Sequence, residues 1–253
     1  MIDALYISAS GLRSQQEQID VISNNVANMQ TPGFKRSRVS FAEVARQGAL
    51  DASQWTQSEG GGTRIQATLP VFSEGEIRPT HNATDLAIDG AGFFELETEQ
   101  GERVYTRAGQ FRIDAEGYLV SAGGLRLAQG VRIPQDAVDL RISDTGEITA
   151  RLADDTERTT LGALELASFA SPDALQSLGD NNFAPTDASG AASFGRAGDP
   201  GFGRLQQGYV EMANVDLIDE MTSLVMAQRA YQLNARVLQA SDQIMETINN
   251  LRR

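Results

Sequence analysis

The sequence predicts an α+β protein in which long N- and C-terminal helices pair as a coiled-coil-like unit, with an antiparallel β-rich domain between them in the chain. Three observations predict this fold class. Apolar residues recur at every seventh position near the start of the chain and again near its end, and the middle consists of short alternating runs separated by glycine and acidic residues. Heptad spacing is typical of helices that pack along a narrow seam, and bounded alternation is typical of β-hairpins.

An N-terminal assembly helix is predicted over residues 1–30. Polar residues separate the members of its apolar stripe, which are Leu5, Leu12, Ile19 and Val26. A narrow stripe of this kind packs against one partner helix. The helix ends before Pro32, because the proline ring excludes the preceding residue from the helical region.

A turn and an extended connector are predicted over residues 31–77. The sequence Thr31-Pro32-Gly33-Phe34 favours a type II turn, with proline and glycine at the two central positions and Phe34 as a hydrophobic anchor at the exit. Residues 47–62 are rich in turn-forming residues, and Trp55 is their only large anchor. We expect that stretch to be irregular.

Three asparagines, Asn24, Asn25 and Asn28, lie beside the apolar stripe at the end of the predicted helix. Asparagine has poor helix propensity, so their number calls for an explanation. A helix end that frays into a capped turn would explain one or two of them. Hydrogen bonds from buried amides to adjacent chains would explain all three, and this is the hypothesis carried forward.

A β-rich central domain is predicted over residues 78–205, with antiparallel sheet from about 78 to 169. A short internal repeat supports hairpins: Arg112-Ile113 followed by Gly117 recurs as Arg141-Ile142 followed by Gly146. Residues 179–203 accumulate Asn, Asp, Ser, Pro and Gly with few large apolar side chains. We expect an exposed irregular loop there.

A C-terminal assembly helix is predicted over residues 206–253. No proline or glycine follows Gly208, and an uninterrupted run of this length favours a coiled-coil-like partner. The apolar positions are Leu217, Met221, Leu224, Tyr231, Leu238 and Met245. The seam is imperfect at Gln228 and Asp242, so ordinary amphipathic helices that pack on their own domain remain the alternative. Their place at opposite ends of the chain favours pairing with each other or with neighbouring copies.

Composition excludes several classes of protein. The 253 residues contain no cysteine and one histidine, so disulfides, thiolate metal sites and cysteine nucleophiles are excluded, and few histidine-ligated metal centres are possible. The net charge of −13 has the wrong sign for nucleic acid or for an anionic membrane surface. No stretch approaches the length of a membrane-spanning helix, and the first residues lack the basic and apolar regions of a cleaved signal. Lys35 is the only lysine, which we interpret as codon bias.

Catalytic templates also fail. Gly90-Ala-Gly92 lacks the third glycine of a dinucleotide fingerprint, and no histidine lies near Ser8 or Ser10 in the sequence. His81 lies among turn-forming residues, which makes a general base improbable. The acidic residues flank turn glycines without calcium-loop spacing; they are Asp114, Glu116, Asp144 and Glu147. We therefore expect no enzyme activity, no cofactor and no metal.

The residues that follow the first stripe carry a resemblance. Asn24-Asn25-Val26-Ala27-Asn28 followed by Thr31-Pro32-Gly33-Phe34 resembles the N-terminal signature of the bacterial flagellar axial proteins, the rod, hook and hook-associated family. Further similar segments cover most of the chain: Ser10-Gly11-Leu12, residues 85–94, 105–111, 207–211 and 214–216, and Ala227-Gln-Arg-Ala-Tyr231.

The resemblance implies a structural subunit without catalytic chemistry. Family members pair their terminal helices into an inner layer of concentric coiled-coil-like tubes, with the β-rich domain outside. They are exported without a cleaved signal peptide and polymerise helically, here into a rod of the basal body that spans the periplasm and transmits torque. The implied partners are copies of the chain, neighbouring rod and hook subunits, ring or bushing proteins around the rod, and the flagellar export apparatus.

Within the family, the chain length and the Asn-Asn-Val and Gln-Arg-Ala-Tyr motifs are closest to the distal rod subunit. The region between Phe41 and Asp85 is shorter than expected for that subunit, so a proximal rod or hook subunit is the alternative. Two other classes are alternatives: a secreted β-rich adhesin, which would need a stalk repeat and a signal peptide, and a hydrolase using carboxylates such as Asp85 and Asp89. The chain shows neither a stalk repeat nor a signal peptide, and its sequence has no visible active site.

Overall fold

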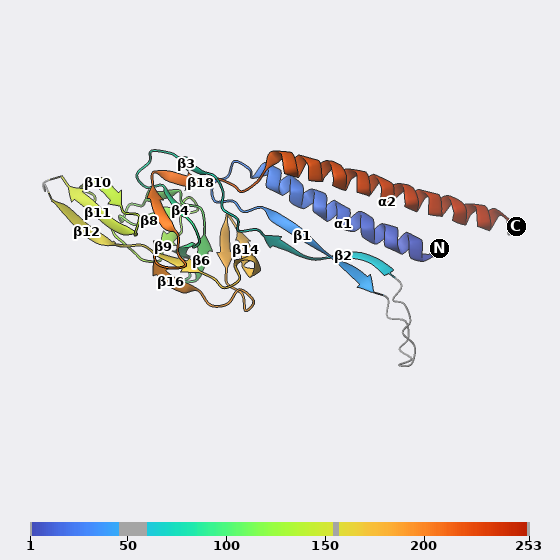
Figure 1. Ribbon diagram of the computed structural model, residues 1–253, viewed down its shortest axis with the longest axis horizontal. Coiled ribbons are helices and arrows are strands. Elements are labelled where there is room, and N and C mark those ends of the chain that lie inside the picture. The colour runs from blue at the N-terminus through green and yellow to red at the C-terminus, as the bar shows by residue number, and fades with distance from the viewer. Residues whose placement is uncertain (1, 46–59, 154–156, 252–253) are drawn as a thin grey trace. The chain divides into compact units, whose positions relative to one another are not determined.

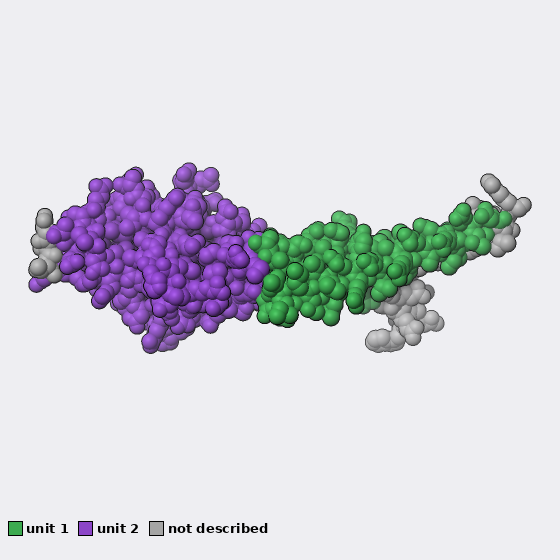
Figure 2. Space-filling model, turned by 90° about the horizontal axis from the view of Figure 1, so that it is seen from above, with its two compact units in different colours: residues 1–27, 37–69, 216–253 green, residues 28–36, 70–215 purple. Residues whose placement is uncertain are grey.

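The computed structural model describes residues 2–45, 60–153 and 157–251 (Figure 1). It has a helix near each end of the chain and antiparallel sheets between them, which confirms the predicted α+β class. Two compact units are present (Figure 2). Unit 1 comprises Met1–Ala27, Ser37–Leu69 and Asp216–Arg253, and unit 2 comprises Asn28–Arg36 and Pro70–Val215. The chain therefore passes between the units four times.

The first helix, α1, spans Ile2–Ala27. It ends three residues short of the predicted boundary because Asn28 already begins a turn, in which the Thr31 amide donates to the Asn28 carbonyl at 2.9 Å. The poor helix propensity of the asparagines and the restriction that Pro32 places on Thr31 account for this position.

The last helix, α2, spans Leu217–Leu251. Asp216 caps it: its Oδ1 accepts hydrogen bonds from the amides of Ile218 at 2.8 Å and Asp219 at 3.2 Å. The predicted start at residue 206 is wrong. Gly208 has a φ of +80°, and the residues on either side of it form short strands that pair with distant parts of the chain.

Within unit 1, α1 and α2 lie side by side (Figure 1). The seam between them is built from small and polar residues. Ser8, Gly11 and Ser14 are buried on α1, as are Glu220 and Ala227 on α2. A Cβ at Gly11 would lie 2.8 Å from Asn234 Nδ2, so the helices approach closely at that level.

Unit 1 also contains a two-stranded sheet formed by β1 (Ser37–Ala45) and β2 (Gly60–Pro70). Near the start of β2, the Thr63 amide donates to Ser10 Oγ of α1 at 3.2 Å. The connector predicted over 31–77 therefore includes paired strands. The stretch predicted to be irregular, 47–62, lies largely outside the described residues, as does Trp55.

Unit 2 is built on a seven-stranded sheet in the order β14-β15-β6-β5-β9-β8-β7. In that order the strands are Gln176–Gly179, Asn182–Ala184, Arg103–Thr106, Phe94–Glu97, Arg126–Leu127, Leu119–Ser121 and Phe111–Ile113. Its strand pairs are antiparallel, as predicted.

Smaller antiparallel sheets complete unit 2. A three-stranded sheet consists of β10 (Ala137–Ile142), β11 (Glu147–Leu152) and β12 (Arg158–Ala163). The two-stranded sheets pair β13 (Glu165–Ser168) with β16 (Ser193–Arg196), β4 (Leu86–Asp89) with β17 (Arg204–Gln207), and β3 (Ile77–Pro79) with β18 (Tyr209–Glu211). One 3-10 helix spans Pro172–Ala174.

The segment predicted as an irregular loop, 179–203, contains strands β15 and β16, which corrects that prediction. Asp180 and Asn181 have positive φ angles of 51° and 59° and make the tight hairpin turn that joins β14 to β15. Phe183 then packs in the core opposite Tyr105. Strand β15 also pairs with β6, and β16 pairs with β13, and these more distant pairings leave no signal in the local sequence.

The hairpin interpretation of the acidic turn residues is confirmed. Asp114 Oδ1 accepts the amides of Glu116 at 2.8 Å and Tyr118 at 2.9 Å, and these contacts lower the pKa of Asp114. Gly117 has a φ of +92°, and Gly146 in the matching turn has a φ of +88°. These turns join β7 to β8 and β10 to β11.

Two apolar clusters fill unit 2. The larger one lies under the central strands and includes Leu86 and Ile88 of β4, Phe94 of β5 and Leu205 of β17. The smaller one is aromatic and includes Phe93, Tyr105, Phe169 and Phe183, with Phe72 packed against it. Edge-to-face rings at 4.9–5.7 Å centroid separation stabilise it.

Candidate assembly interface and connector clamp

The predicted stripe of α1 lies beside the seam with α2 rather than forming it. Leu5, Leu12, Ile19 and Val26 are all half-buried. The fully buried positions on this helix are instead small or polar, with the exception of Ile22. Each heptad residue therefore retains apolar surface that α2 does not cover.

The predicted stripe of α2 is more open still. Leu224 and Leu238 are half-buried, but Leu217, Met221, Tyr231 and Met245 keep 39%, 49%, 38% and 40% of their surface exposed. Further exposed apolar residues share the helix: Ile218, Val225, Met226, Leu233, Val237 and Ile244. We call these ten exposed residues the apolar surface of α2. With 3.6 residues per turn, these residues lie on several sides of the helix, as expected where more than one neighbouring chain contacts it.

Asn25 uses its amide within the chain. The side chain is buried at 2% exposure, its Oδ1 accepts the Ser37 amide at 2.9 Å, and its Nδ2 donates to the Ser37 carbonyl at 2.9 Å. The same nitrogen lies 3.4 Å from Glu220 Oε1 on α2. For Asn25 the hypothesis of bonds to an adjacent chain is therefore wrong: one amide joins α1 to β1 and to the first turn of α2.

The other two asparagines have different positions. Asn24 is exposed on α1. Asn28 lies in the turn, where its Oδ1 accepts from the Thr31 hydroxyl at 3.3 Å. Asn28 is thus engaged in the turn after the helix, and the exposed Asn24 remains a predicted interface residue.

Substitution of Asn25 should loosen unit 1. Asn25→Asp keeps the shape but turns the donating nitrogen into an oxygen that faces the Ser37 carbonyl and Glu220. We expect it to lower the stability of unit 1 by about 2–3 kcal/mol, since buried groups lose their partners. Hydrogen exchange at the amides of α1 and β1 measures the effect. Gln239→Glu, an amide-to-carboxylate change at an exposed site of α2, is the control, and equal exchange in both variants would contradict the prediction.

The predicted type II turn at Thr31-Pro32-Gly33-Phe34 is confirmed. The Phe34 amide donates to the Thr31 carbonyl at 3.2 Å, and Gly33 has a φ of +73°. The turn is held within unit 2, where the Gly33 amide donates to the Glu211 carbonyl at 2.7 Å and Asn181 Nδ2 donates to the Pro32 carbonyl at 3.1 Å. These contacts fix the first residues of the connector.

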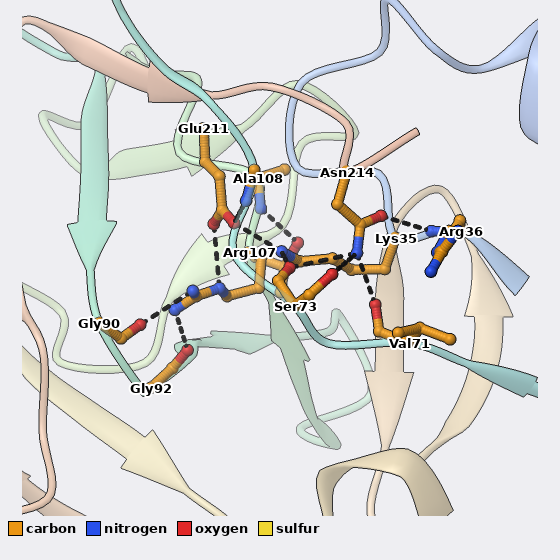
Figure 3. Close-up of polar contacts among 12 residues, drawn as sticks. Lys35, Arg36, Val71, Ser73, Gly90, Gly92, Arg107, Ala108, Glu211 and Asn214 are labelled. Atoms are coloured by element: carbon orange, nitrogen blue, oxygen red, sulfur yellow. Dashed lines mark hydrogen bonds and ion pairs between the residues drawn. The ribbon is translucent and has the colours of Figure 1, made fainter. Parts of the chain in front are cut away.

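The residues after the turn enter a buried ionic cluster that the sequence analysis missed (Figure 3). We call Lys35, Arg107, Glu211 and Asn214 the connector clamp. Lys35 Nζ lies 2.5 Å from Glu211 Oε1 and donates to the Ser73 carbonyl at 2.7 Å. Arg107 Nε lies 3.0 Å from Glu211 Oε2. All three charged side chains are at most 5% exposed.

Backbone contacts complete the connector clamp. The guanidinium of Arg107 donates to the carbonyls of Gly92 at 2.7 Å and Gly90 at 2.9 Å (Figure 3). Glu211 Oε1 also accepts the Gly75 amide at 2.9 Å. One carboxylate therefore holds two cations and a backbone amide from three separate segments of unit 2.

Asn214 ties the connector to the segment after β2. Its Oδ1 accepts the Arg36 amide at 2.8 Å, while its Nδ2 donates to the Val71 carbonyl at 2.7 Å and to Ser73 Oγ at 2.8 Å (Figure 3). The side-chain amide of Asn214 thus bonds to backbone groups of Arg36 and Val71, which lie on two neighbouring stretches of the chain.

The electrostatics of the connector clamp reflect its burial. Desolvation lowers the pKa of Lys35, and the Glu211 carboxylate opposes that shift. Burial likewise lowers the pKa of Arg107, again against the attraction of Glu211. Lys35 therefore has a defined structural role, while the codon-bias interpretation, which concerns the scarcity of lysine elsewhere in the chain, stays an interpretation. The uniqueness of Lys35, and the motifs that contain Arg107 and Glu211, were the signals available in the sequence.

The residues weighed for catalysis have structural surroundings. His81 lies in an exposed turn with a φ of +59°, Asp85 accepts from Asn82 at 3.1 Å, and Asp89 accepts from Gln206 at 2.9 Å. Among residues 2–45, 60–153 and 157–251, no group of three or more His, Cys, Asp or Glu side chains is placed to hold a metal ion. In those same ranges, no helix is long and apolar enough to cross a membrane.

Known families match three parts of the chain that coincide with the elements above. The Flagella basal body rod protein family matches residues 5–35, which contain α1 and the turn. The D1 domain of the flagellar hook protein FlgE/F/G family matches residues 87–150 in unit 2. The C-terminal region of the flagellar basal body rod FlgEFG proteins matches residues 206–251, which contain Glu211, Asn214 and α2.

Full-length relatives decide the family. The flagellar basal-body rod protein FlgG of Caulobacter vibrioides is 38% identical over 261 residues, which cover 99% of this chain and 100% of the relative. The chain belongs to the FlgG family of flagellar basal-body rod proteins. FlgG of Agrobacterium fabrum is 38% identical, covering 97% of this chain and 98% of the relative, and FlgG of Borreliella burgdorferi is 35% identical over the full length of both.

Membership in the FlgG family makes the chain a structural subunit of the flagellar basal-body rod. The family is one of structural proteins, in agreement with the resemblance described from the sequence. The connector clamp and the apolar surface of α2 are accordingly features of a subunit that assembles.

Proposed function

We propose that the chain forms the distal part of the flagellar rod, where copies polymerise helically into a tubular shaft that transmits torque from motor to hook. The observation that carries this proposal is the apolar surface of α2, which the paired α1 leaves uncovered in the described part of the chain. Burial of apolar surface is the main favourable term in association, and a surface that meets a different patch on the next copy propagates an open helix.

The composition of the α1–α2 seam supports the same assignment. Apart from Ile22, the fully buried positions on α1 and α2 are small or polar, while ten large apolar residues of α2 remain at least 38% exposed. A helix pair designed only to stabilise its own subunit would place the large apolar residues between the helices. In unit 1 the large apolar residues of α2 are instead available to contact neighbouring copies.

The names of the full-length relatives favour the distal rod over the proximal rod and the hook. FlgG of Caulobacter vibrioides aligns over 261 residues, which cover 99% of this chain and all of the relative, so the two chains are similar in length. The proposed neighbours are copies of the chain, other rod subunits and the hook. Ring or bushing proteins would surround the shaft, and the flagellar export apparatus would deliver each subunit across the inner membrane without a cleaved signal.

Polymerisation is the measurement that tests this proposal. We expect Met221→Glu combined with Tyr231→Glu to raise the critical concentration for tube formation at least about tenfold, because two buried charges would each cost more than about 1 kcal/mol. Gln232→Glu, which adds a charge at an exposed polar position of α2, is the control. The melting of unit 2 should be the same in all three chains.

Electron microscopy gives the decisive readout for location. Tubes should form with the unmodified chain and with Gln232→Glu, and labelled protein should lie between the motor and the hook in isolated basal bodies. Tubes that form equally well with the double variant would contradict the assembly role of the apolar surface of α2. Label confined to the proximal end of the shaft would contradict the assignment to the distal rod.

A further inference from the structure

The last residues of unit 2 complete a core that is otherwise assembled from earlier segments. Strand β17 pairs with β4 in the register Leu205 to Ile88, and both of these side chains lie in the larger apolar cluster. Strand β18 pairs with β3, with Glu211 opposite Ile77. The core of unit 2 is therefore open along β3 and β4 until residues 204–211 are in place.

The connector clamp adds an electrostatic condition to this geometry. In the complete fold Lys35 and Arg107 lie in a buried site, where both positive charges have lost most of their hydration. Glu211 is the buried anion that faces both of them. Glu74 also attracts the two cations, but it is exposed, so solvent and salt weaken its effect.

Gly75 and Asn214 mark the positions at which residues 211–214 fit against the earlier segments of unit 2. A Cβ at Gly75 would lie 1.9 Å from the Met212 carbonyl oxygen, so the strand that carries Glu211 passes directly over this glycine. Asn214 then satisfies the Arg36 amide and the Val71 carbonyl. These two bonds form only once residues 211–214 are in place.

We infer that residues 204–214 close the fold of unit 2, and that Glu211 is the closing residue: the connector and the central sheet remain unlocked until its carboxylate meets Lys35 and Arg107. Folding of the β-rich unit is thus delayed until nearly the whole of its sequence is available. A chain emerging from its N-terminal end cannot complete unit 2 early, which suits a subunit that is exported unfolded; this last step alone rests on the proposed function.

Pulse labelling during refolding of the full chain tests the order of closure. Lys35 is the only lysine, so a lysine adduct of an amine-reactive reagent reports on a single buried site. Paired pulses of this reagent and of deuterium at successive times follow Lys35 and the backbone amides together. We expect Lys35 and the amides of β4, β5 and β6 to become protected in the same phase as those of β17 and β18. Protection of Lys35 and of β5–β6 in an earlier phase would overturn the inference.

A second arm uses folded protein at equilibrium. In Glu211→Gln the rate of Lys35 labelling should rise at least about tenfold, because local opening of the site becomes easier. Glu102→Gln makes the same chemical change at an exposed position of unit 2 and should leave the rate unchanged. An unchanged rate in Glu211→Gln would overturn the closing role. Neither arm involves polymerisation, so failure here is distinguishable from failure of the rod assignment.

Discussion

Replacement of Glu211 by glutamine should lower the free energy of unfolding of unit 2 by about 3–5 kcal/mol, which is the cost of leaving buried charge uncompensated. The change removes the anion that faces Lys35 and Arg107, and both cations are at most 5% exposed. Typical domains are stable by only about 5–15 kcal/mol, so a large part of the fold's stability depends on one carboxylate. Urea unfolding followed by hydrogen exchange at the amides of β4, β5 and β6, which belong to unit 2, measures it.

The number of unpaired buried cations predicts the order of stability among related variants. Lys35→Met leaves the one-to-one pair of Arg107 with Glu211 and should be the mildest change. The double variant Lys35→Met with Glu211→Gln leaves one unpaired cation and should lie between the two single variants. Removal of Lys35 is thus expected to stabilise the Glu211→Gln protein. If the double variant were less stable than Glu211→Gln, electrostatics would not explain the clamp.

Gly33→Ala should cost about 2–5 kcal/mol for two separate reasons. A positive φ of +73° disfavours any residue with a Cβ by about 1–2 kcal/mol, and the added carbon would lie 2.4 Å from both the N and Cα of Ala108. Because the obstruction is backbone, the turn itself must move, which adds about 1–3 kcal/mol. Thermal unfolding of unit 2 by calorimetry measures the total.

Gly101→Ala is the matched control for this change. Gly101 has a φ of +81°, and a Cβ at that position would meet nothing within 4 Å. It should therefore show only the conformational cost of about 1–2 kcal/mol. Equal losses at the two glycines would mean that the close approach of the turn to Ala108 carries no energetic weight.

The sequence predicted the helices well but misplaced their contact. Heptad spacing indicates which side of a helix is apolar, but it does not indicate what covers that side. In unit 1 the paired helices meet through residues such as Gly11 and Ala227, because small side chains permit a close approach. The large residues at the predicted positions, Met221 among them, are left facing outward.

Long-range pairing accounts for the other differences. Strands β15, β16, β17 and β18 are short, and each pairs with a strand distant in the sequence, namely β6, β13, β4 and β3, although β15 also forms a local hairpin with β14. A strand of three or four residues carries too little pattern to be recognised alone. The connector clamp is equally non-local: Lys35 and Glu211 are 176 residues apart, and only the fold brings their charges together.

The division of the chain into units has a mechanical consequence. The backbone passes from one unit to the other after Ala27, Arg36, Leu69 and Val215, so four covalent crossings join what most two-part proteins connect by a single linker. A load applied between the units is shared among four backbone segments that act in parallel. Cleavage of any one crossing by a protease would leave three covalent crossings, and the two resulting fragments would be held together by the contacts within each unit.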